Sequence, residues 1–263
     1  MAVDMKLLKE LRATTSAPLK DCKQALEETN NDFSAAQERL KQKGIMKAAS
    51  KADRITKEWL VLVKTIDGKT VGLKLACETD FVARNDTFRW LADKIVDMLA
   101  QSNPIESWDQ ADDVLKTRIE DLLKENFVAI GENMQVLAAF VKEGTSYVYT
   151  HPGNKLVAVV FYSGDEQIAK EVAMQVAAMS PEYLCVEDVS TDEYEQMASK
   201  YREEVVASGK PADIVEKIIA GKIAKDMSNI VLLEQPSIID DSQKVKDRLK
   251  DTEVTAFIRY SIG

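Results

Sequence analysis

The residue types that most often carry catalysis are sparse and scattered in this chain. The one histidine, His151, stands in a predicted turn, and three cysteines lie far apart without a CxxC pair. A zinc site needs clustered cysteine or histidine ligands, which this spacing does not offer. A serine–histidine–aspartate set stays open in sequence order alone, but the GxSxG elbow is missing. The pattern predicts no metal centre and favours an exposed turn or a partner contact for His151.

Nucleotide-binding and calcium-binding patterns are also incomplete. Gly209-Lys210 resembles the end of a phosphate loop, but Pro211 replaces the required Ser or Thr, and the upstream glycine is missing. The paired acids Asp112-Asp113 and Asp240-Asp241 lack the spaced oxygen ligands of a calcium loop, so they predict caps or turns. We therefore expect no cofactor and no enzymatic activity.

One stretch, Thr79-Asp80-Phe81-Val82, places a carboxylate beside a large aromatic side chain. Alternating residues over 71–77 predict a strand before it, and helical spacing from Phe88 to Leu99 predicts a helix after it. Loops at strand ends often present functional groups on a rigid scaffold. Phe81 is therefore either packed beneath the following helix or held out as a wedge for a partner. The residues alone leave both interpretations open.

Composition narrows the class of protein further. The chain has 263 residues, 30% of them charged, and a net charge of −9. The acidic balance disfavours direct binding of nucleic acid and favours a soluble protein that meets basic surfaces. We expect no membrane association, because no apolar run approaches roughly 18 residues and the N-terminus lacks a leader pattern. Sparse cysteines are typical of reduced thiols in a cytoplasmic protein.

The N-terminal region predicts a small helical bundle. Residues 4–43 carry three short helical patterns, in which Pro18 can begin a helix, Asp32 is a good N-cap and Gly44 is the expected stop. A bundle of about 40 residues lies near the lower size limit for independent folding and has the size of a ubiquitin-associated-type interaction module. The basic stretch 41–54 has no interleaved aromatic residues to stack bases, so it predicts a solvated linker.

The rest of the chain predicts an α+β core. A strong hairpin signal at Asp67-Gly68 joins strands 59–66 and 69–77. Helices are expected at 86–100 and 111–126, and further strands at 134–142, 146–150 and 155–162 precede a helix at 165–179. Strands followed by a helix thus occur twice, at 59–100 and 134–179, which predicts two related subdomains with antiparallel sheets.

A helical hairpin is expected between these strands and the end of the chain. Two apolar stripes within 190–227 are joined at Ser208-Gly209-Lys210-Pro211, and the hairpin either packs on the core or projects as a coiled coil. A helix at 243–251 and a strand at 254–262 follow. The expected domains are the bundle and linker at 1–54, core subdomains at 55–133 and 134–186, the hairpin at 187–228, and a return to the second subdomain at 229–263.

Several separated motifs closely resemble, in register, those of the bacterial translation elongation factor Ts family. They are Lys9-Glu10-Leu11-Arg12, Asp21-Cys22-Lys23-Gln24-Ala25-Leu26, Thr79-Asp80-Phe81-Val82-Ala83-Arg84, Ile130-Gly131-Glu132-Asn133, Ser208-Gly209-Lys210-Pro211 and Val254-Thr255-Ala256-Phe257-Ile258-Arg259. The resemblance implies a guanine-nucleotide exchange factor for the GTPase elongation factor Tu, with the fold described above.

The resemblance also implies which residues contact the partner. Thr79, Asp80, Phe81 and Val82 would enter beside the magnesium and phosphate sites and displace Mg²⁺. The bundle would dock on the GTPase domain through Leu11, Leu19, Asp21 and Cys22, and His151 would reach another domain of the partner.

Two departures from the family pattern affect this expectation. The segment Ala17-Pro18-Leu19-Lys20 is less rich in glycine and methionine than in many members, which could weaken the contact of the bundle. The further C-terminal helical module of many members is also missing from this sequence. The hairpin could contact the partner, support a homodimer or a 2:2 complex, or do neither. The rival functions are an assembly adaptor that leaves nucleotide binding unchanged, and RNA binding, which the acidic balance disfavours.

Overall fold

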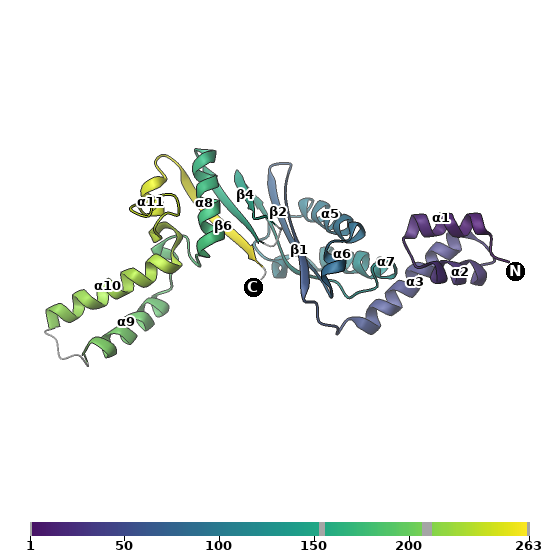
Figure 1. Ribbon diagram of the computed structural model, residues 1–263, viewed down its shortest axis with the longest axis horizontal. Helices are drawn as coiled ribbons and strands as arrows, with labels where there is room; N and C mark the ends of the chain where they lie inside the picture. The colour runs from purple at the N-terminus through teal and green to yellow at the C-terminus, as the bar shows by residue number, and fades with distance from the viewer. Residues whose placement is uncertain (1, 153–155, 207–211, 262–263) are drawn as a thin grey trace. The chain divides into compact units, whose positions relative to one another are not determined.

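The computed structural model describes residues 2–152, 156–206 and 212–261. Its contacts divide the chain into two units, Met1–Glu143 and Gly144–Gly263. N-terminal helices are followed by two antiparallel three-stranded sheets with helices (Figure 1), which confirms the α+β class. The motif predicted at 208–211 lies outside the described residues, as does most of the predicted turn after His151.

The first unit begins with the expected bundle of three helices. They are α1 (Met5–Thr15), α2 (Leu19–Glu28) and α3 (Phe33–Lys51). Pro18 immediately precedes α2, and the Asp32 carboxylate caps α3 by accepting the Ala35 N–H, as predicted. Apolar residues at helical spacing close the bundle core, which includes Leu8, Leu11, Cys22, Ala25, Leu26, Ala36 and Leu40.

The remaining elements of the first unit form its sheet and covering helices. They are β1 (Glu58–Ile66), β2 (Lys69–Cys77), α4 (Asp80–Ala83), α5 (Asp86–Ala100), a 3-10 turn (Trp108–Gln110), α6 (Asp113–Glu125), α7 (Phe127–Ile130) and β3 (Gln135–Glu143). Asp67 and Gly68 turn the hairpin with φ values of 50° and 77°, as the predicted Asp-Gly signal requires. The apolar residues of β2 that alternate with polar ones pack with the buried face of α5.

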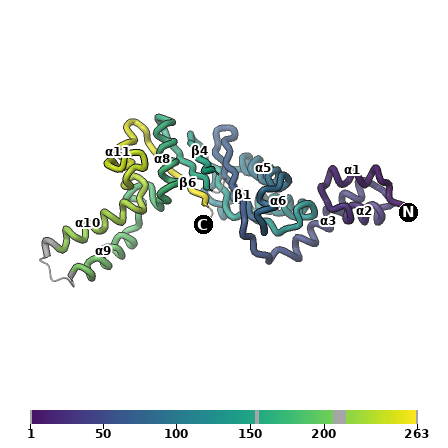
Figure 2. The backbone as a smooth tube through the Cα atoms, in the orientation of Figure 1, coloured from purple at the N-terminus to yellow at the C-terminus, as the bar shows by residue number. Residues whose placement is uncertain are grey.

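The predicted end of the third helix at Gly44 is wrong. Helix α3 continues without interruption to Lys51 (Figure 2). A Cβ at position 44 would lie 2.9 Å from Val128 Cγ2 and 3.2 Å from the Lys124 carbonyl oxygen. Glycine therefore permits close packing of α3 against α6 and α7, and it does not terminate the helix here.

The basic stretch 41–54 extends α3 to Lys51 and is tied to its own chain, so it is part of the packed first unit and not the solvated linker that was predicted. Its partners are Glu125 for Lys41, Asp21 for Lys43 and Lys47, the Gly131 carbonyl for Lys51, and Glu78 for Arg54. These charges therefore stabilise packing within the first unit.

The second unit contains the other sheet and an inserted pair of helices. Its elements are β4 (Ser146–Thr150), β5 (Leu156–Ser163), α8 (Glu166–Met179), a 3-10 turn (Val186–Asp188), α9 (Thr191–Val206), α10 (Ala212–Ile230), a second 3-10 turn (Leu232–Glu234), α11 (Val245–Arg248) and β6 (Glu253–Ser261). The helix predicted at 243–251 is thus only the short α11. Helix α8 covers one face of the sheet through a buried stripe that includes Val172 and Val176.

Helices α9 and α10 pack against each other (Figure 1). Lys222 forms an ion pair with Glu204 at 2.7 Å, and the Tyr201 hydroxyl donates to Asp226. Residue numbers rise along α9 as they fall along α10 in these two contacts, so the two helices are antiparallel. A shared apolar cluster fills the seam with Val205, Val215, Ile219, Ile223 and Met227.

The strand predicted at 134–142 belongs to the first sheet, not to the second subdomain. β3 pairs with β2, and the sheet order is β1-β2-β3. Gly72 opposes Phe140 in this register, and a Cβ at position 72 would lie 2.0 Å from the Phe140 ring. A bare glycine thus makes room for an aromatic ring across the strand pair. The first unit consequently ends at Glu143 and not at residue 133.

The repeat is present, but its bounds differ from those predicted. Each unit runs hairpin, helix and third strand, with the third strand added antiparallel beside the second. The sheet orders β1-β2-β3 and β4-β5-β6 therefore correspond. The repeated parts are β1 to β3 and β4 to β6, not residues 59–100 and 134–179.

Candidate functional site

The Phe81 loop, defined as residues 78–85, connects β2 to α5 and is built from local caps. Thr79 is the N-cap of α4, and its hydroxyl accepts the Val82 N–H at 3.5 Å. Asn85 caps α5 by accepting the Thr87 N–H at 2.8 Å. Threonine and asparagine favour these positions because their side chains satisfy the free N–H groups of a first helical turn.

Within this loop, Phe81 faces solvent. Its side chain is 82% exposed, so the interpretation that it packs beneath α5 is wrong. Val82 instead packs against the core of the first unit. Asp80 lies 3.4 Å from Arg84, and both side chains are largely exposed, so this ion pair contributes little to stability. The loop thus anchors one apolar residue and presents its neighbour.

Glu132 joins the loop from the segment before β3. One carboxylate oxygen accepts the Glu78 and Thr79 N–H groups, each at 3.0 Å, and the other accepts the Thr79 hydroxyl at 2.6 Å. Glu132 appeared in the sequence only as part of a motif, and no role was expected for it. No local pattern could have revealed the contact, because it joins residues far apart in the chain.

A second set of contacts ties the loop to the linker after α3. The Asn133 N–H donates to Glu78 at 2.7 Å, and its amide nitrogen donates to the Ala52 and Arg54 carbonyls at 2.9 and 2.8 Å. Arg54 reaches the other oxygen of Glu78 at 3.3 Å. Sequence reasoning also missed Asn133 and Glu78 as site residues.

Cys77 closes the underside of the loop. Its thiol donates to the Thr79 carbonyl at 3.3 Å, and burial raises its pKa to about 12. The thiol therefore stays protonated at neutral pH and acts as a hydrogen-bond donor.

The bundle residues expected to contact a partner divide into two groups. Leu11 and Cys22 are fully buried in the bundle core, so direct contact through their side chains is incompatible with this structure. Leu19 is 50% exposed. Asp21 binds Lys43 at 2.7 Å and Lys47 at 3.3 Å. Although burial opposes ionisation of Asp21, hydrogen bonds and charge from both lysines outweigh it and hold its pKa below the ordinary value.

His151 is exposed at the end of β4 in the second unit, as the turn pattern predicted. The imidazole Nδ1 of His151 lies 3.1 Å from the Tyr149 hydroxyl, and the backbone N–H of His151 donates to the Leu156 carbonyl at 2.9 Å. The surroundings hold the ring at the surface, where a partner could reach it.

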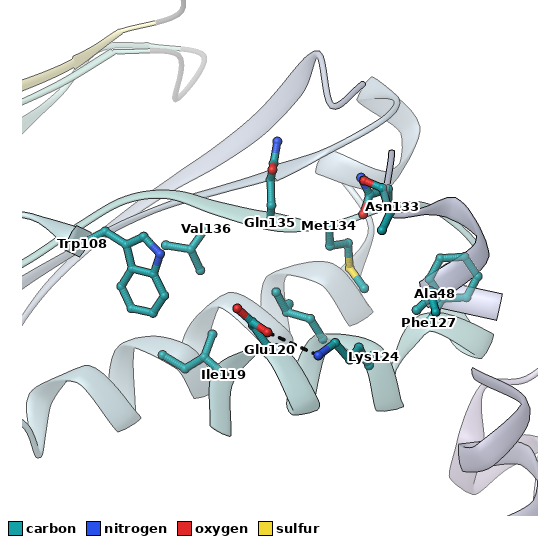
Figure 3. Close-up of a pocket in the computed structure, with 13 residues that line it drawn as sticks. Ala48, Trp108, Ile119, Glu120, Lys124, Phe127, Asn133, Met134, Gln135 and Val136 are labelled. Atoms are coloured by element: carbon teal, nitrogen blue, oxygen red, sulfur yellow. Dashed lines mark hydrogen bonds and ion pairs between the residues drawn. The ribbon is translucent and has the colours of Figure 1, made fainter. Parts of the chain in front are cut away.

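A cavity of about 360 Å³ lies where α3, α6 and β3 meet. Trp108 lies at one end, and Ala48 and Phe127 lie at the other (Figure 3). Its charged lining residues, Glu120 and Lys124, already pair at 3.2 Å. The cavity therefore offers apolar walls and no unpaired charge to attract a phosphate.

A second hollow of about 350 Å³ lies between the end of α1 and the start of α5, directly after the Phe81 loop. Its lining is polar apart from Trp90, which is 46% exposed, and Ala129. No lysine or arginine lines it. This arrangement suits a protein surface better than an anionic ligand.

The described residues contain no group of three or more histidine, cysteine or acidic side chains placed to hold a metal ion. In the same part of the chain, no helix combines the length and apolar composition that a membrane crossing requires.

Aromatic residues are enriched at the centres of protein–protein interfaces, so the exposed Phe81 on its anchored loop is a candidate contact for a protein partner. Comparison with known proteins identifies the family. The family profile described as Elongation factor TS matches residues 78–263. Proteins called elongation factor Ts from Hydrogenobaculum sp. and Aquifex aeolicus are 40% and 37% identical to the whole chain, which spans 100% and 99% of their lengths. A third, from Idiomarina loihiensis, is 38% identical over the whole chain and 92% of its own length.

The chain belongs to the elongation factor Ts family, and its function therefore lies in translation elongation.

Proposed function

We propose that this protein is a guanine-nucleotide exchange factor that binds elongation factor Tu with GDP and promotes release of the GDP. Membership of the family supports the partner and the activity. The observation that carries the proposal is Phe81, a large apolar side chain that is 82% exposed on an otherwise well-anchored loop. The protein would work in the cytoplasm, without a cofactor and without making or breaking a covalent bond.

The proposed mechanism uses burial of Phe81 in the GTPase. Tight nucleotide binding to a GTPase depends on Mg²⁺, which bridges phosphate oxygens and protein ligands. Packed helices resist local deformation, so a ring inserted between them moves them as rigid bodies. Complete burial of one Phe side chain contributes about 1.5–3 kcal/mol, which can be used to displace the groups around the metal.

Asp80 and Val82 have different parts in this mechanism. Within the described residues, the Asp80 carboxylate pairs with the exposed Arg84, so it is available to accept hydrogen bonds from groups around the magnesium site. Val82 packs on the core and anchors the turn from which Phe81 projects. The effect is reciprocal. If the exchange protein lowers the affinity of the GTPase for nucleotide by some factor, bound nucleotide lowers the affinity of the GTPase for the exchange protein by the same factor. Fresh GTP would therefore release the exchange factor.

Other surfaces would supply affinity for the partner. In the bundle, exposed Leu19 and the neighbouring Asp21 are the remaining candidates for contact with the GTPase domain, and Leu11 and Cys22 would support them from the core. His151 would contact another domain of elongation factor Tu. The packing of α9 on α10 supports a coiled-coil arm at 187–228, which could also join two copies.

Phe81→Ala tests the proposal. The variant is expected to melt within a few degrees of the wild type, because truncating an exposed side chain removes little packing. It should release fluorescent GDP from elongation factor Tu much more slowly in stopped-flow mixing. Asp80→Ala is expected to slow release to a smaller degree. Val114→Ala, which truncates another apolar side chain at 70% exposure on α6, serves as the matched control.

Undiminished exchange by a folded Phe81→Ala protein would contradict the wedge mechanism. An assembly adaptor gives a different result, because the wild-type chain would then bind elongation factor Tu without any acceleration of GDP release.

A further inference from the structure

We infer that Glu132 is a positioning residue for nucleotide exchange, and that it acts by fixing the direction in which Phe81 projects. The inference rests on the proposed function, which it deepens by adding a residue outside the Phe81 loop. Among the residues expected to meet the partner, Glu132 touches Thr79, and it makes no hydrogen bond to Asp80 or Phe81 in the described part of the chain. Its contacts are confined to the base of the loop at Glu78 and Thr79.

The place of Glu132 in the sheet explains why the loop needs it. The ladder between β2 and β3 ends with Ala76 opposite Gln135, and the loop begins at Glu78. The N–H groups of Glu78 and Thr79 therefore lie beyond the last backbone partner that β3 provides. Glu132 continues the pairing with its side chain, which uses both carboxylate oxygens to accept three donors. Hydrogen bonds to an ionised acceptor are stronger than neutral ones, so the base of the loop is firmly held.

Thr79 transmits this fixation to Phe81. Its hydroxyl donates to Glu132 and accepts the Val82 N–H, so one oxygen connects the carboxylate to the first turn of α4. Because α4 carries Phe81, the orientation of this turn sets the direction of the aromatic ring. Because its hydroxyl is already used in these two hydrogen bonds, Thr79 has a positioning role in place of the direct partner contact expected from the sequence.

Asn133, which follows Glu132, binds the linker after α3 to the base of the Phe81 loop. Asn133 binds the carbonyls of Ala52 and Arg54, and its N–H binds Glu78. Glu78 is itself bound by Arg54. The linker that follows the bundle and the loop that carries Phe81 thus share one anchor, the dipeptide Glu132-Asn133.

The test compares Glu132→Ala and Glu132→Gln in stopped-flow release of fluorescent GDP from elongation factor Tu. We expect Glu132→Ala to lower the maximal rate at saturating exchange protein by about tenfold or more, because two N–H donors lose their acceptor. Its half-saturating concentration should change less, since the other contact surfaces are intact. Glu132→Gln should recover part of the rate, because its remaining oxygen can still accept both N–H groups. Glu120→Ala, which removes an exposed carboxylate paired with Lys124, is the matched control and should match the wild type.

A double-mutant cycle separates positioning from general stabilisation. In a Phe81→Ala background, Glu132→Ala should cause no further slowing, because the residue through which it acts is gone. Alkylation of the Cys77 thiol, which donates to the Thr79 carbonyl, reports on the loop without any partner. Glu132→Ala should accelerate alkylation of Cys77 and leave that of Cys22 in the bundle core unchanged. If Glu132→Ala does not melt cooperatively, Thr79→Val, which removes only the hydroxyl, takes its place.

Three results would overturn the inference. They are a wild-type maximal rate for folded Glu132→Ala, equal slowing with and without Phe81, and unchanged alkylation of Cys77. If the wild-type chain itself fails to accelerate GDP release, the proposed function fails, and the alkylation comparison still decides whether Glu132 holds the loop.

Discussion

The two units use the same strand order but connect the second strand to the covering helix in different ways. In the second unit, Gly164 and Asp165 alone lead from β5 into α8. In the first unit, the Phe81 loop between β2 and α5 includes the extra helical turn α4. Corresponding positions in the two repeats thus carry a minimal turn in one unit and a displayed side chain in the other.

Both connections are fastened from the same place, the segment immediately before the third strand. Thr252 precedes β6, and its hydroxyl accepts the Asp165 N–H at 3.1 Å. Glu132 lies shortly before β3 and accepts the N–H groups of Glu78 and Thr79. A short hydroxyl suffices where the turn is tight, and a longer carboxylate reaches further donors where the loop is extended. The segment before the third strand thus holds the connection in both units, whether that connection is a tight turn or the longer Phe81 loop.

The largest expected effect separates the scaffold of the first unit from its loop. Phe88→Ala should lower the free energy of unfolding by about 3–5 kcal/mol, because Phe88 is fully buried on the core-facing side of α5. Phe81→Ala should change the free energy of unfolding by much less, although both substitutions remove the same ring and lie only seven residues apart. Urea unfolding of the two variants measures the difference. Equal destabilisation would mean that Phe81 supports the fold, and the contrast between displayed and structural residues would be lost.

The local parts of this architecture were accessible from the sequence. Asp67-Gly68 specifies its turn through its own backbone preferences, and the apolar spacing of α5 and α8 identifies their buried faces without knowledge of their partners. The family resemblance singled out Phe81, and the spacing of apolar residues placed Leu11 and Cys22 on helical faces. The resemblance assigned both residues to partner contact, but the structure packs them in the core of the bundle.

The long-range parts were not accessible in this way. The pattern of β3 shows that it is a strand but not which strand it pairs with, and only the folded sheet shows that the Phe140 ring fits over Gly72 of β2. Gly44 has a local preference for helix ends, which close packing on Val128 overrides. The bond between Glu132 and Thr79 links segments that only the folded sheet brings together.

A smaller loss of stability is expected from adding a side chain at Gly164, in the turn that connects β5 to α8 in the second unit. Gly164 has φ of +115°, and a Cβ there would lie 2.9 Å from Thr252 Cα. Gly164→Ala should cost about 2–4 kcal/mol through backbone strain and overpacking. Gly68→Ala is the matched control, because Gly68 also has a positive φ of +77° but no atom within 4 Å of the added Cβ. We expect it to cost about 1–2 kcal/mol.

Thermal and urea unfolding of both glycine variants measure this difference. The rate of GDP release per folded molecule should stay at the wild-type value for Gly164→Ala, because the connection of the second unit displays no side chain. Selective loss of exchange in that variant would show that the two connections share a function as well as a fold.

The smallest expected effect contrasts Glu132 with an acidic residue of the second unit that serves stability alone. Glu234 binds Lys244 at 2.6 Å and Lys246 at 2.7 Å, and thereby ties the second 3-10 turn to α11. Hydrogen bonds from Lys244 and Lys246 lower the pKa of Glu234 below its ordinary value of 4.5. Since the folded state holds the lower pKa, the stabilisation is present above pH 4.5 and is lost as the pH falls through the folded value. Glu234→Gln should therefore cost about 1 kcal/mol at neutral pH, because both lysines are nearly half exposed, and progressively less as the pH is lowered below 4.5.

Salt distinguishes the two acids because their partners differ in charge. The lysines of Glu234 are screened by added salt, so the cost of Glu234→Gln should shrink in about 1 M NaCl. The partners of Glu132 are N–H groups and a hydroxyl, which carry no net charge, so the effect of Glu132→Ala on Cys77 alkylation should persist there. Urea unfolding at low and high salt measures the first, and alkylation under the same conditions measures the second. If instead salt abolishes the Glu132 effect and leaves that of Glu234 unchanged, the fastening before β3 is electrostatic and its likeness to the neutral hydroxyl of Thr252 is lost.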